Sequence, residues 1–168
     1  QVKITYDGFY SLQRLAKLPD YMDGSEFYDF KMKRFSGAMT QSERNIHEAG
    51  TWTNWIDIGL RNGETQQHTL SVSGGTNNTK FFISGSYLNV KGLAVNDKYQ
   101  RITSRINIDT KVLDWLTIGS RTQISFDDKS GLGPDMSDLF QTNPLTKAYE
   151  EDGSLAIYIW DDDHYFGN

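Results

Sequence analysis

Residues 100–112 decide the fold, and they read QRITSRINIDTKV. Apolar or small side chains occupy the even positions Ile102, Ser104, Ile106 and Ile108. Charged and amide side chains occupy odd positions, among them Arg105 and Asp109. Successive side chains of a β-strand point to opposite faces, so this period of two predicts a strand with one apolar and one polar face. Because the polar face carries charges in mid-strand, it must meet water or a wet cavity.

Four further stretches show the same alternation. The five strands are expected near residues 2–12, 66–74, 79–90, 100–112 and 116–127. They run for about 9 to 13 residues, whereas soluble strands usually have five or six and membrane-crossing strands need roughly 9 to 11. Two environments fit these faces: one sheet of a soluble sandwich, or a membrane barrel with lipid outside and a polar lumen. Strand length favours the barrel.

The connections between these strands alternate in length. Short links fall at residues 74–78 and 110–115, and longer ones at 13–65, 91–99 and 128–168. Counting strand direction puts both short links at one end of the strands and all the longer connections at the other. Outer-membrane barrels have short periplasmic turns and longer extracellular loops. We therefore expect residues 13–65, 91–99 and 128–168 to be outer loops.

The long loops contain helix signals. Gly24 and Ser25 precede residues 26–35, which have acids in the first turn and bases in the last; this pattern predicts an N-capped helix with Gly37 as its C-cap. Residues 53–59 predict a second short helix capped by Thr53. Residues 135–148 are expected to be helical only in part, because Pro144 interrupts them.

Composition excludes several classes of protein. The chain has 168 residues, 13% of them aromatic, no cysteine and a formal charge of −5. The lack of cysteine excludes disulfides, zinc-finger spacings and a thiol nucleophile, and the acidic balance argues against a nucleic-acid partner. No apolar run approaches the roughly 20 residues of a membrane-spanning helix. Residues 1–5 lack the basic and apolar pattern of a signal peptide, so none is expected in this sequence.

No residue is predicted to be catalytic, cofactor-binding or metal-binding. The three histidines, His47, His68 and His164, have no partner at a useful spacing, so an enzyme is not expected. The acidic run 161–163 lacks the alternating ligands of a calcium loop and is interpreted as solvated. Trp52, Trp55 and Trp115 fit an interfacial aromatic girdle and ordinary loop packing equally well.

Two sets of residues are candidates for contact. Aromatic side chains among acids near the C-terminal end either pack within their loop, the favoured interpretation, or contact substrate or a covering lid. The candidates for that contact are Tyr158, Trp160, His164 and Tyr165. The polar strand faces supply the residues predicted to face the lumen, which are Lys3, Asp7, Arg105, Asn107, Arg121 and Gln123.

Several stretches resemble a known family. Residues 68–75 (HTLSVSGG) and 79–88 (TKFFISGSYL) resemble the early barrel hairpin of SusC/RagA-type TonB-dependent outer-membrane transporters, which characterise Bacteroidetes. Residues 114–119 (DWLTIG) continue the match, and residues 5–10 (TYDGFY) look like the first barrel strand after the plug. The resemblance covers nearly the whole chain, and its specificity lies in the combination of these pieces.

The resemblance implies an all-β fold, a transmembrane antiparallel β-barrel of roughly 22 strands. The chain is expected to be a fragment from the N-terminal part of that barrel, about five strands with a partly helical extracellular loop. The plug domain, the TonB box and the N-terminal extension are not expected within this sequence.

The resemblance also implies a function: TonB-dependent import of an oligosaccharide or peptide across the outer membrane of a Gram-negative, Bacteroidetes-like bacterium. Its expected partners are a SusD-like surface lipoprotein acting as a lid, TonB through regions outside this sequence, and outer-membrane lipid. No cofactor is expected. The alternative from the residues is a soluble or secreted β-sandwich that binds carbohydrate.

Overall fold

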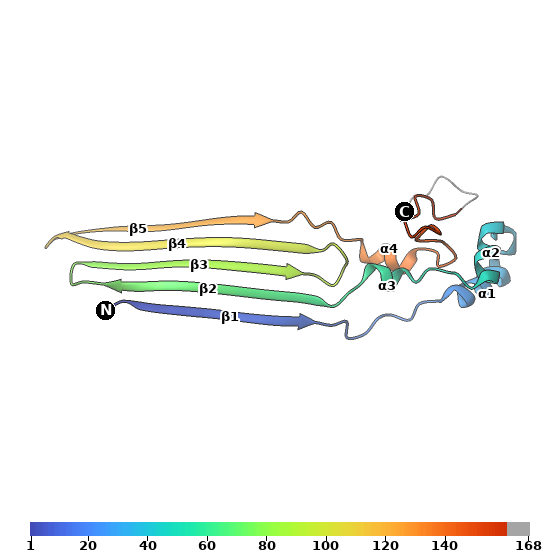
Figure 1. The fold of residues 1–168 in the computed structure, drawn as a ribbon, viewed down its shortest axis with the longest axis horizontal. Helices are drawn as coiled ribbons and strands as arrows, with labels where there is room; N and C mark the ends of the chain where they lie inside the picture. The colour runs from blue at the N-terminus through green and yellow to red at the C-terminus, as the bar shows by residue number, and fades with distance from the viewer. Residues whose placement is uncertain (161–168) are drawn as a thin grey trace. The chain divides into compact units, whose positions relative to one another are not determined.

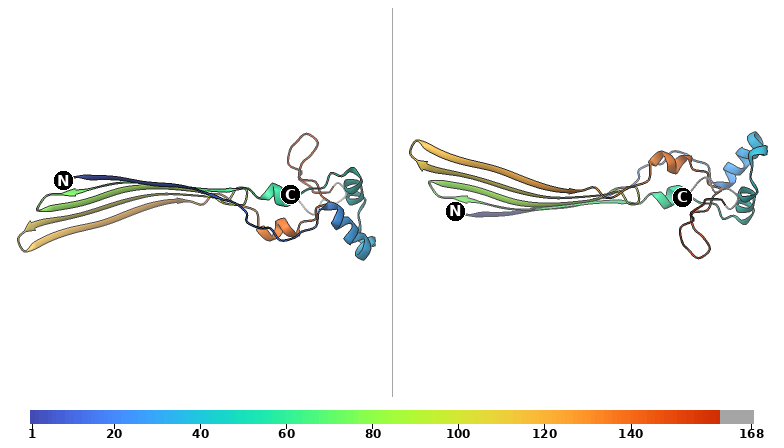
Figure 2. Two further views of the ribbon diagram at one scale, coloured as in Figure 1. Left: turned by 90° about the horizontal axis from the view of Figure 1, so that it is seen from below. Right: turned by 90° about the horizontal axis from the view of Figure 1, so that it is seen from above.

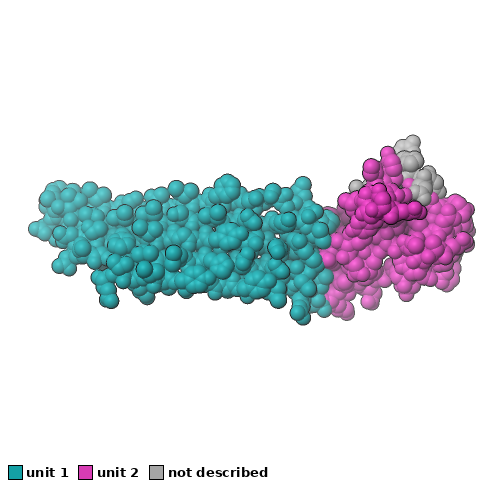
Figure 3. Space-filling model, in the orientation of Figure 1, with its two compact units in different colours: residues 1–16, 61–134 teal, residues 17–60, 135–168 magenta. Residues whose placement is uncertain are grey.

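The computed structural model describes residues 1–160, and the chain divides into two compact units (Figure 3). Unit 1 comprises residues 1–16 and 61–134, and unit 2 comprises residues 17–60 and the chain from residue 135 onward. The two long connections of the sequence thus supply unit 2, and the strands supply unit 1.

Unit 1 is a five-stranded antiparallel sheet with strand order β1-β2-β3-β4-β5 (Figure 1). The strands are β1 (Lys3–Gln13), β2 (Gly63–Gly75), β3 (Thr79–Lys91), β4 (Lys98–Leu113) and β5 (Leu116–Asp128). Every strand pairs with the next one in the sequence. All five expected strands are present, and most extend beyond the expected bounds because the ladder continues into the polar flanks of the alternating stretches.

The register places the two kinds of side chain on opposite faces of this sheet. Directly paired residues share a face, and one central row reads Ile4, Val72, Ile83, Ile106 and Thr122. The next row, on the other face, reads Thr5, Ser71, Ser84, Arg105 and Gln123. We call these the apolar face and the polar face. The alternation in the sequence therefore corresponds to two chemically distinct surfaces.

Unit 1 is a single layer. Both views of Figure 2 show one sheet, and residues 1–16 and 61–134 form neither a second sheet nor a helix. Large side chains of the apolar face are consequently exposed, with Ile4 at 69%, Ile124 at 68% and Phe126 at 70%. A β-sandwich would bury this face against a second sheet, so the sandwich alternative finds no support in the described residues.

The two ends of the sheet have different connections. The turns at residues 76–78 and 114–115 lie at one end, and the connections after β1, β3 and β5 leave from the other (Figure 1). In the first turn, the Thr76 hydroxyl accepts the amide hydrogens of Asn78 at 3.3 Å and Thr79 at 3.2 Å. The β4–β5 turn is shorter than expected, because β4 continues to Leu113.

The described residues of unit 2 form four α-helices and a short 3₁₀ helix: α1 (Gly24–Phe35), η1 (Ser36–Ala38), α2 (Gln41–Ala49), α3 (Trp55–Gly59) and α4 (Met136–Gln141). Helix α1 begins after Asp23, whose side chain forms a capping box with Glu26, and not after Ser25 as expected. Helix α3 is capped by Asn54 and not by Thr53, whose hydroxyl is engaged elsewhere. Helix α4 ends before Pro144, as expected.

The core of unit 2 is small. Its buried apolar side chains are Met39, Ile56, Leu60, Leu139, Leu145, Ala148, Ala156 and Ile159. They come from both long connections, so neither connection has a core of its own. Among residues 1–160, no helix combines the length and apolar character needed to cross a membrane.

Candidate functional site

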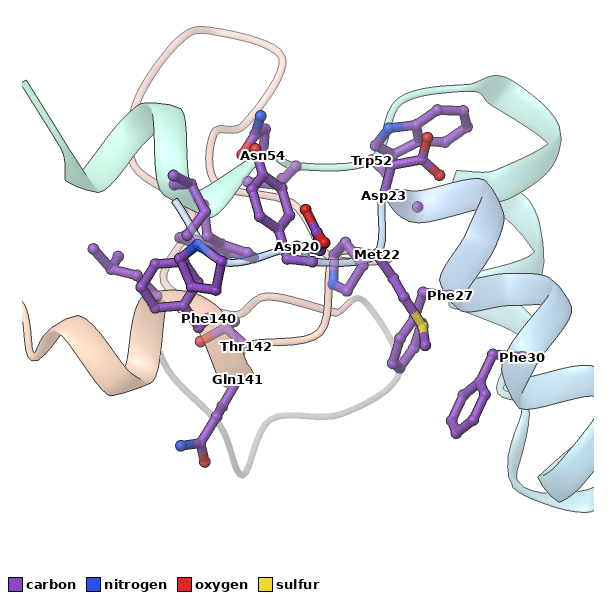
Figure 4. A pocket seen from close by; sticks show the side chains of 18 residues that line it. Asp20, Met22, Asp23, Phe27, Phe30, Trp52, Asn54, Phe140, Gln141 and Thr142 are labelled. Carbon is purple, nitrogen blue, oxygen red and sulfur yellow. The ribbon is translucent and has the colours of Figure 1, made fainter. Parts of the chain in front are cut away.

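Unit 2 contains a pocket of about 460 Å³ formed by three segments of the chain (Figure 4). These segments are residues 19–30, comprising the approach to α1 and its first turns, residues 52–56, and residues 139–144. We call this cavity the loop pocket. It lies entirely within unit 2, and its three wall segments come from the two long connections, which strands β2 to β5 separate in the sequence.

The lining of the loop pocket is aromatic with a polar margin. Its aromatic side chains are Tyr21, Phe27, Phe30, Trp52, Trp55 and Phe140. Its polar side chains include Asp20, Asp23, Asn54, Gln141 and Thr142. Small-molecule and peptide sites combine apolar rings with a few polar groups in this way, because the rings supply contact area and the polar groups fix orientation. The pocket is therefore suited to a ring or an apolar side chain that carries polar groups.

Two glycines make the close packing around this pocket possible. A Cβ atom at Gly24 would lie 2.2 Å from Cγ of Trp52, so the tryptophan packs directly on the start of α1. A Cβ atom at Gly59 would lie 2.4 Å from a methyl group of Leu139, the first residue of the third wall segment. Real Cβ atoms do not approach other heavy atoms this closely. Any larger residue would displace the wall it touches.

Hydrogen bonds join the second and third walls of the pocket. The amide of Thr53 donates to the carbonyl of Pro144 at 2.9 Å, and its hydroxyl donates to the carbonyl of Thr146 at 2.6 Å. The indole N–H of Trp55 lies 2.9 Å from the hydroxyl oxygen of Thr146 and 3.2 Å from the carbonyl oxygen of Asn143. Thr53 and Thr146 are buried, which shields these bonds from water.

The six residues predicted to face the lumen share the polar face of unit 1. Lys3, Asn107 and Arg121 lie in one cross-strand row, Arg105 and Gln123 lie in the next, and Asp7 lies in the third. Arg121 donates to both carboxylate oxygens of Asp109, at 2.9 and 2.7 Å. Arg105 donates to the side-chain carbonyl of Gln123 at 2.6 and 3.1 Å. The prediction that this face meets a lumen stays a prediction.

Tyr158 and Trp160, the candidate contact residues that lie within the described part of the chain, do not line the loop pocket. Tyr158 is 40% exposed, and the half-buried Trp160 donates its indole N–H to the carbonyl of Leu145 at 2.8 Å. His164, Tyr165 and the acidic run 161–163 lie outside the described residues. Sequence reasoning missed the pocket aromatics as a group. The available signal was the number of large aromatic residues in the two long connections, because a connection without a core of its own consists mostly of polar residues.

Two described acidic side chains outside the strands, Asp135 and Asp152, have lowered pKa values. Hydrogen bonds from the hydroxyl and amide of Ser137 hold the pKa of Asp135 below its ordinary value, so the cap of α4 stays ionised further into the acidic range. Ser154 lowers the pKa of Asp152 in the same way. Across residues 1–160, no three histidine, aspartate or glutamate side chains converge as metal ligands would.

The chain is similar in sequence to TonB-dependent receptors. It is 26% identical over 165 residues to TonB-dependent receptor P3 of Formosa agariphila, and 25% identical over 148 residues to TonB-dependent receptor P26 of that organism. These matches cover 92% and 86% of the chain. The chain spans only about 16% and 15% of the length of these curated relatives. No protein-family profile matches it.

The fold matches solved structures of the RagAB peptide importer. In one RagAB peptide transporter structure the match covers 97% of this chain and 23% of that chain, with a TM-score of 0.71 and 18% identity. In the closed-closed state of the importer the TM-score is 0.69, with 20% identity over 96% of this chain. These matches confirm the resemblance and the fold class expected from the sequence, a five-stranded part of a RagA-type transporter fold.

Proposed function

We propose, from its likeness to TonB-dependent receptors, that this chain is a wall section of an outer-membrane barrel that imports nutrient with energy supplied through TonB. Unit 1 would be the wall, and unit 2 an outer assembly made from the two long loops. The observation that carries the proposal is the sheet with one exposed apolar face and one polar face, matched in fold to a transporter.

The height of the apolar face supports contact with lipid. From Ile102 to Thr110 strand β4 rises about 27 Å, at about 3.4 Å per residue. With a strand tilt of about 40°, this corresponds to about 21 Å along a barrel axis, near the roughly 25 Å apolar band of outer-membrane barrels. Toward the end of the sheet the same face becomes charged. Glu64 and Lys91 form an ion pair of 3.0 Å there, in a row that also contains Lys98.

The polar face supports contact with a wet interior. Arg105 and Arg121 each donate two hydrogen bonds to polar neighbours on that face and remain exposed. Such groups tolerate water at little cost, whereas lipid would leave them without solvation. We therefore assign this face to the lumen.

The loop pocket would serve the outer side of the barrel. Oligosaccharides and peptides both present flat or apolar surfaces flanked by polar groups, which an aromatic pocket with a polar margin accommodates. The pocket would contact either the cargo or a SusD-like surface lipoprotein that covers it. The neighbouring RagAB structures are described as those of a peptide importer, which makes a peptide the first cargo to test.

Cargo uptake by the full-length receptor tests this function. Cells expressing the receptor would be given a tryptic digest of casein and, separately, a mixture of plant oligosaccharides, and depletion of each component would be followed by mass spectrometry. We expect depletion of one class that stops when the receptor gene or TonB is deleted. Depletion unaffected by loss of TonB would refute the proposed mechanism.

The partner is tested separately from uptake. We expect a surface lipoprotein to co-purify with the affinity-tagged receptor in mild detergent, and to be lost when residues 19–24 and 139–144 are replaced by glycine–serine linkers. A receptor purified without a lipoprotein under cross-linking conditions would count against the lid.

A further inference from the structure

We propose that Glu43 and Asn143 are positioning residues that join the two long loops and set the shape of the loop pocket before anything binds there. The role of the pocket in cargo or lid contact rests on the proposed function. The structural junction itself does not, and the experiment below measures the junction directly.

Glu43 is a buried carboxylate with four hydrogen bonds. It lies in α2 and is 0% exposed. One carboxylate oxygen accepts from Nζ of Lys31 at 2.6 Å and from Nδ2 of Asn143 at 2.7 Å. The other accepts from Nζ of Lys31 at 2.8 Å and from the amide of Thr40 at 2.8 Å. Burial of a charge is costly unless the charge is paired and hydrogen-bonded, so each of these partners contributes to keeping Glu43 in place.

Helix capping accounts for only part of this arrangement. Thr40 and Glu43 form a capping box at the start of α2, a device that operates equally well on an exposed helix. Capping does not require burial, nor a partner 100 residues away in the sequence. The bond to Asn143 therefore has a separate consequence, which is to tie the second long loop to the first.

Asn143 transmits this tie to the wall of the pocket. Its side-chain oxygen accepts the amide hydrogen of Leu145 at 2.9 Å, so both ends of the side chain are engaged. Its carbonyl oxygen lies 3.2 Å from the indole nitrogen of Trp55, a pocket-lining residue. Thr142 and Pro144, the neighbours of Asn143, also line the pocket. A shift of Asn143 would consequently move three lining residues together.

The polarity of the Glu43–Asn143 bond allows a test by exchange. In Glu43→Gln, the new N–H₂ group must face donors whichever way the amide is turned, either Lys31 and Asn143 or Lys31 and Thr40. In Asn143→Asp, two carboxylates would lie at hydrogen-bond distance. In the double variant, the amide introduced at position 43 donates to the carboxylate introduced at position 143. The side-chain oxygen at position 43 still accepts from Thr40 and from Lys31, which keeps one of its two bonds to this residue. The second carboxylate oxygen at position 143 accepts from the amide of Leu145.

Hydrogen–deuterium exchange on the full-length receptor in detergent measures the effect. We expect each single variant to raise exchange about tenfold in peptides covering residues 52–58 and 143–149, which contain the Thr53 and Leu145 amides, because an unpaired buried polar group makes local opening easier. The double variant should restore protection. Glu48→Gln, an exposed carboxylate on the same helix, is the matched control and should leave both peptides unchanged.

Two results would overturn the proposal. Unchanged exchange in both single variants would show that the bond does not hold the wall. Exchange that stays raised in the double variant would show general damage to unit 2, because a role based on polarity is rescued by exchange and a packing role is not. Failure of the proposed function would appear as absent uptake and would leave these exchange patterns intact.

Discussion

Gly24 makes room for Trp52 in the wall of the loop pocket. It is buried at the first position of α1, and the indole ring occupies the space that a side chain would take. The φ angle does not require glycine there, so the requirement is one of space and not of backbone conformation. His47 stacks on Trp52, with 6.3 Å between the ring centroids, and on Tyr28, with 3.8 Å between them. One small residue thus sets the position of a chain of rings.

Substitution of Gly24 by alanine tests this requirement. We expect Gly24→Ala to displace Trp52 and to raise exchange in the peptide covering residues 50–56, because overpacking costs about 1–3 kcal/mol. Gly37→Ala is the matched control, since a Cβ atom there would meet nothing within 4 Å. The measurement is hydrogen–deuterium exchange of the full-length receptor. Equal protection in the two variants would contradict the packing described for Trp52.

Strand β4 shows the two faces most clearly at the level of an element. Ile106 is on the apolar face, paired with Ile83 and Thr122, and Asn107 is on the polar face, paired with Phe82 and Arg121. The two residues are adjacent in the sequence, so they share depth along the strand and differ in the surface they present. This makes them a matched pair for locating lipid.

Lysine introduced at these two positions should affect the stability of the barrel to very different extents. We expect Ile106→Lys to reduce the folded, outer-membrane fraction of the receptor, because a lysine facing the middle of a bilayer costs about 2–4 kcal/mol in a barrel. Asn107→Lys should cost at most about 1 kcal/mol, because its charge meets water and only the like charge of Arg121 lies directly opposite. Heat-modifiable mobility on gels and membrane fractionation report the folded fraction. If both lysine variants were tolerated equally, the proposal that the apolar face contacts lipid would be wrong.

The elements differ in how far the sequence predicted them. The strands were predictable because alternation over about ten residues is a local signal that pairing then reinforces. Helix α2 was missed, although Thr40 and Glu43 have the spacing of a capping box and were readable as one. The start of α1 was placed two residues late, since Asp23 and Glu26 form the box there and Ser25 lies inside the helix. For α1 and α2, the spacing of the capping residues predicts the helix start better than the distribution of acidic and basic residues does.

The whole chain presents surfaces that need neighbours. Among the described residues, β1 and β5 each pair on one edge only, and the apolar face has no layer against it. Unpaired strand edges and exposed apolar faces favour aggregation in water and are untenable in lipid. We therefore expect the sheet to need further strands for its stability, and its fold match covers 22% of the transporter chain.

Residues 1–168 expressed alone should not behave as a folded domain. We expect insoluble protein, or soluble material without a cooperative thermal transition by circular dichroism. The full-length receptor in detergent, as the control, should melt cooperatively. A stable soluble monomer of the isolated chain with a sharp transition would contradict the barrel assignment. It would favour an independently folded soluble domain.

The sequence by itself determined unit 1: five strands, their two faces and the sorting of short and long connections to opposite ends. Each of these follows from local alternation and turn length, which need no knowledge of distant contacts. The loop pocket was decided only by the tertiary structure. Glu43 meets Asn143, and Trp55 meets Thr146, across about a hundred residues of intervening chain. No periodicity encodes such a meeting, because loops without a repeating pattern are positioned by the contacts they make.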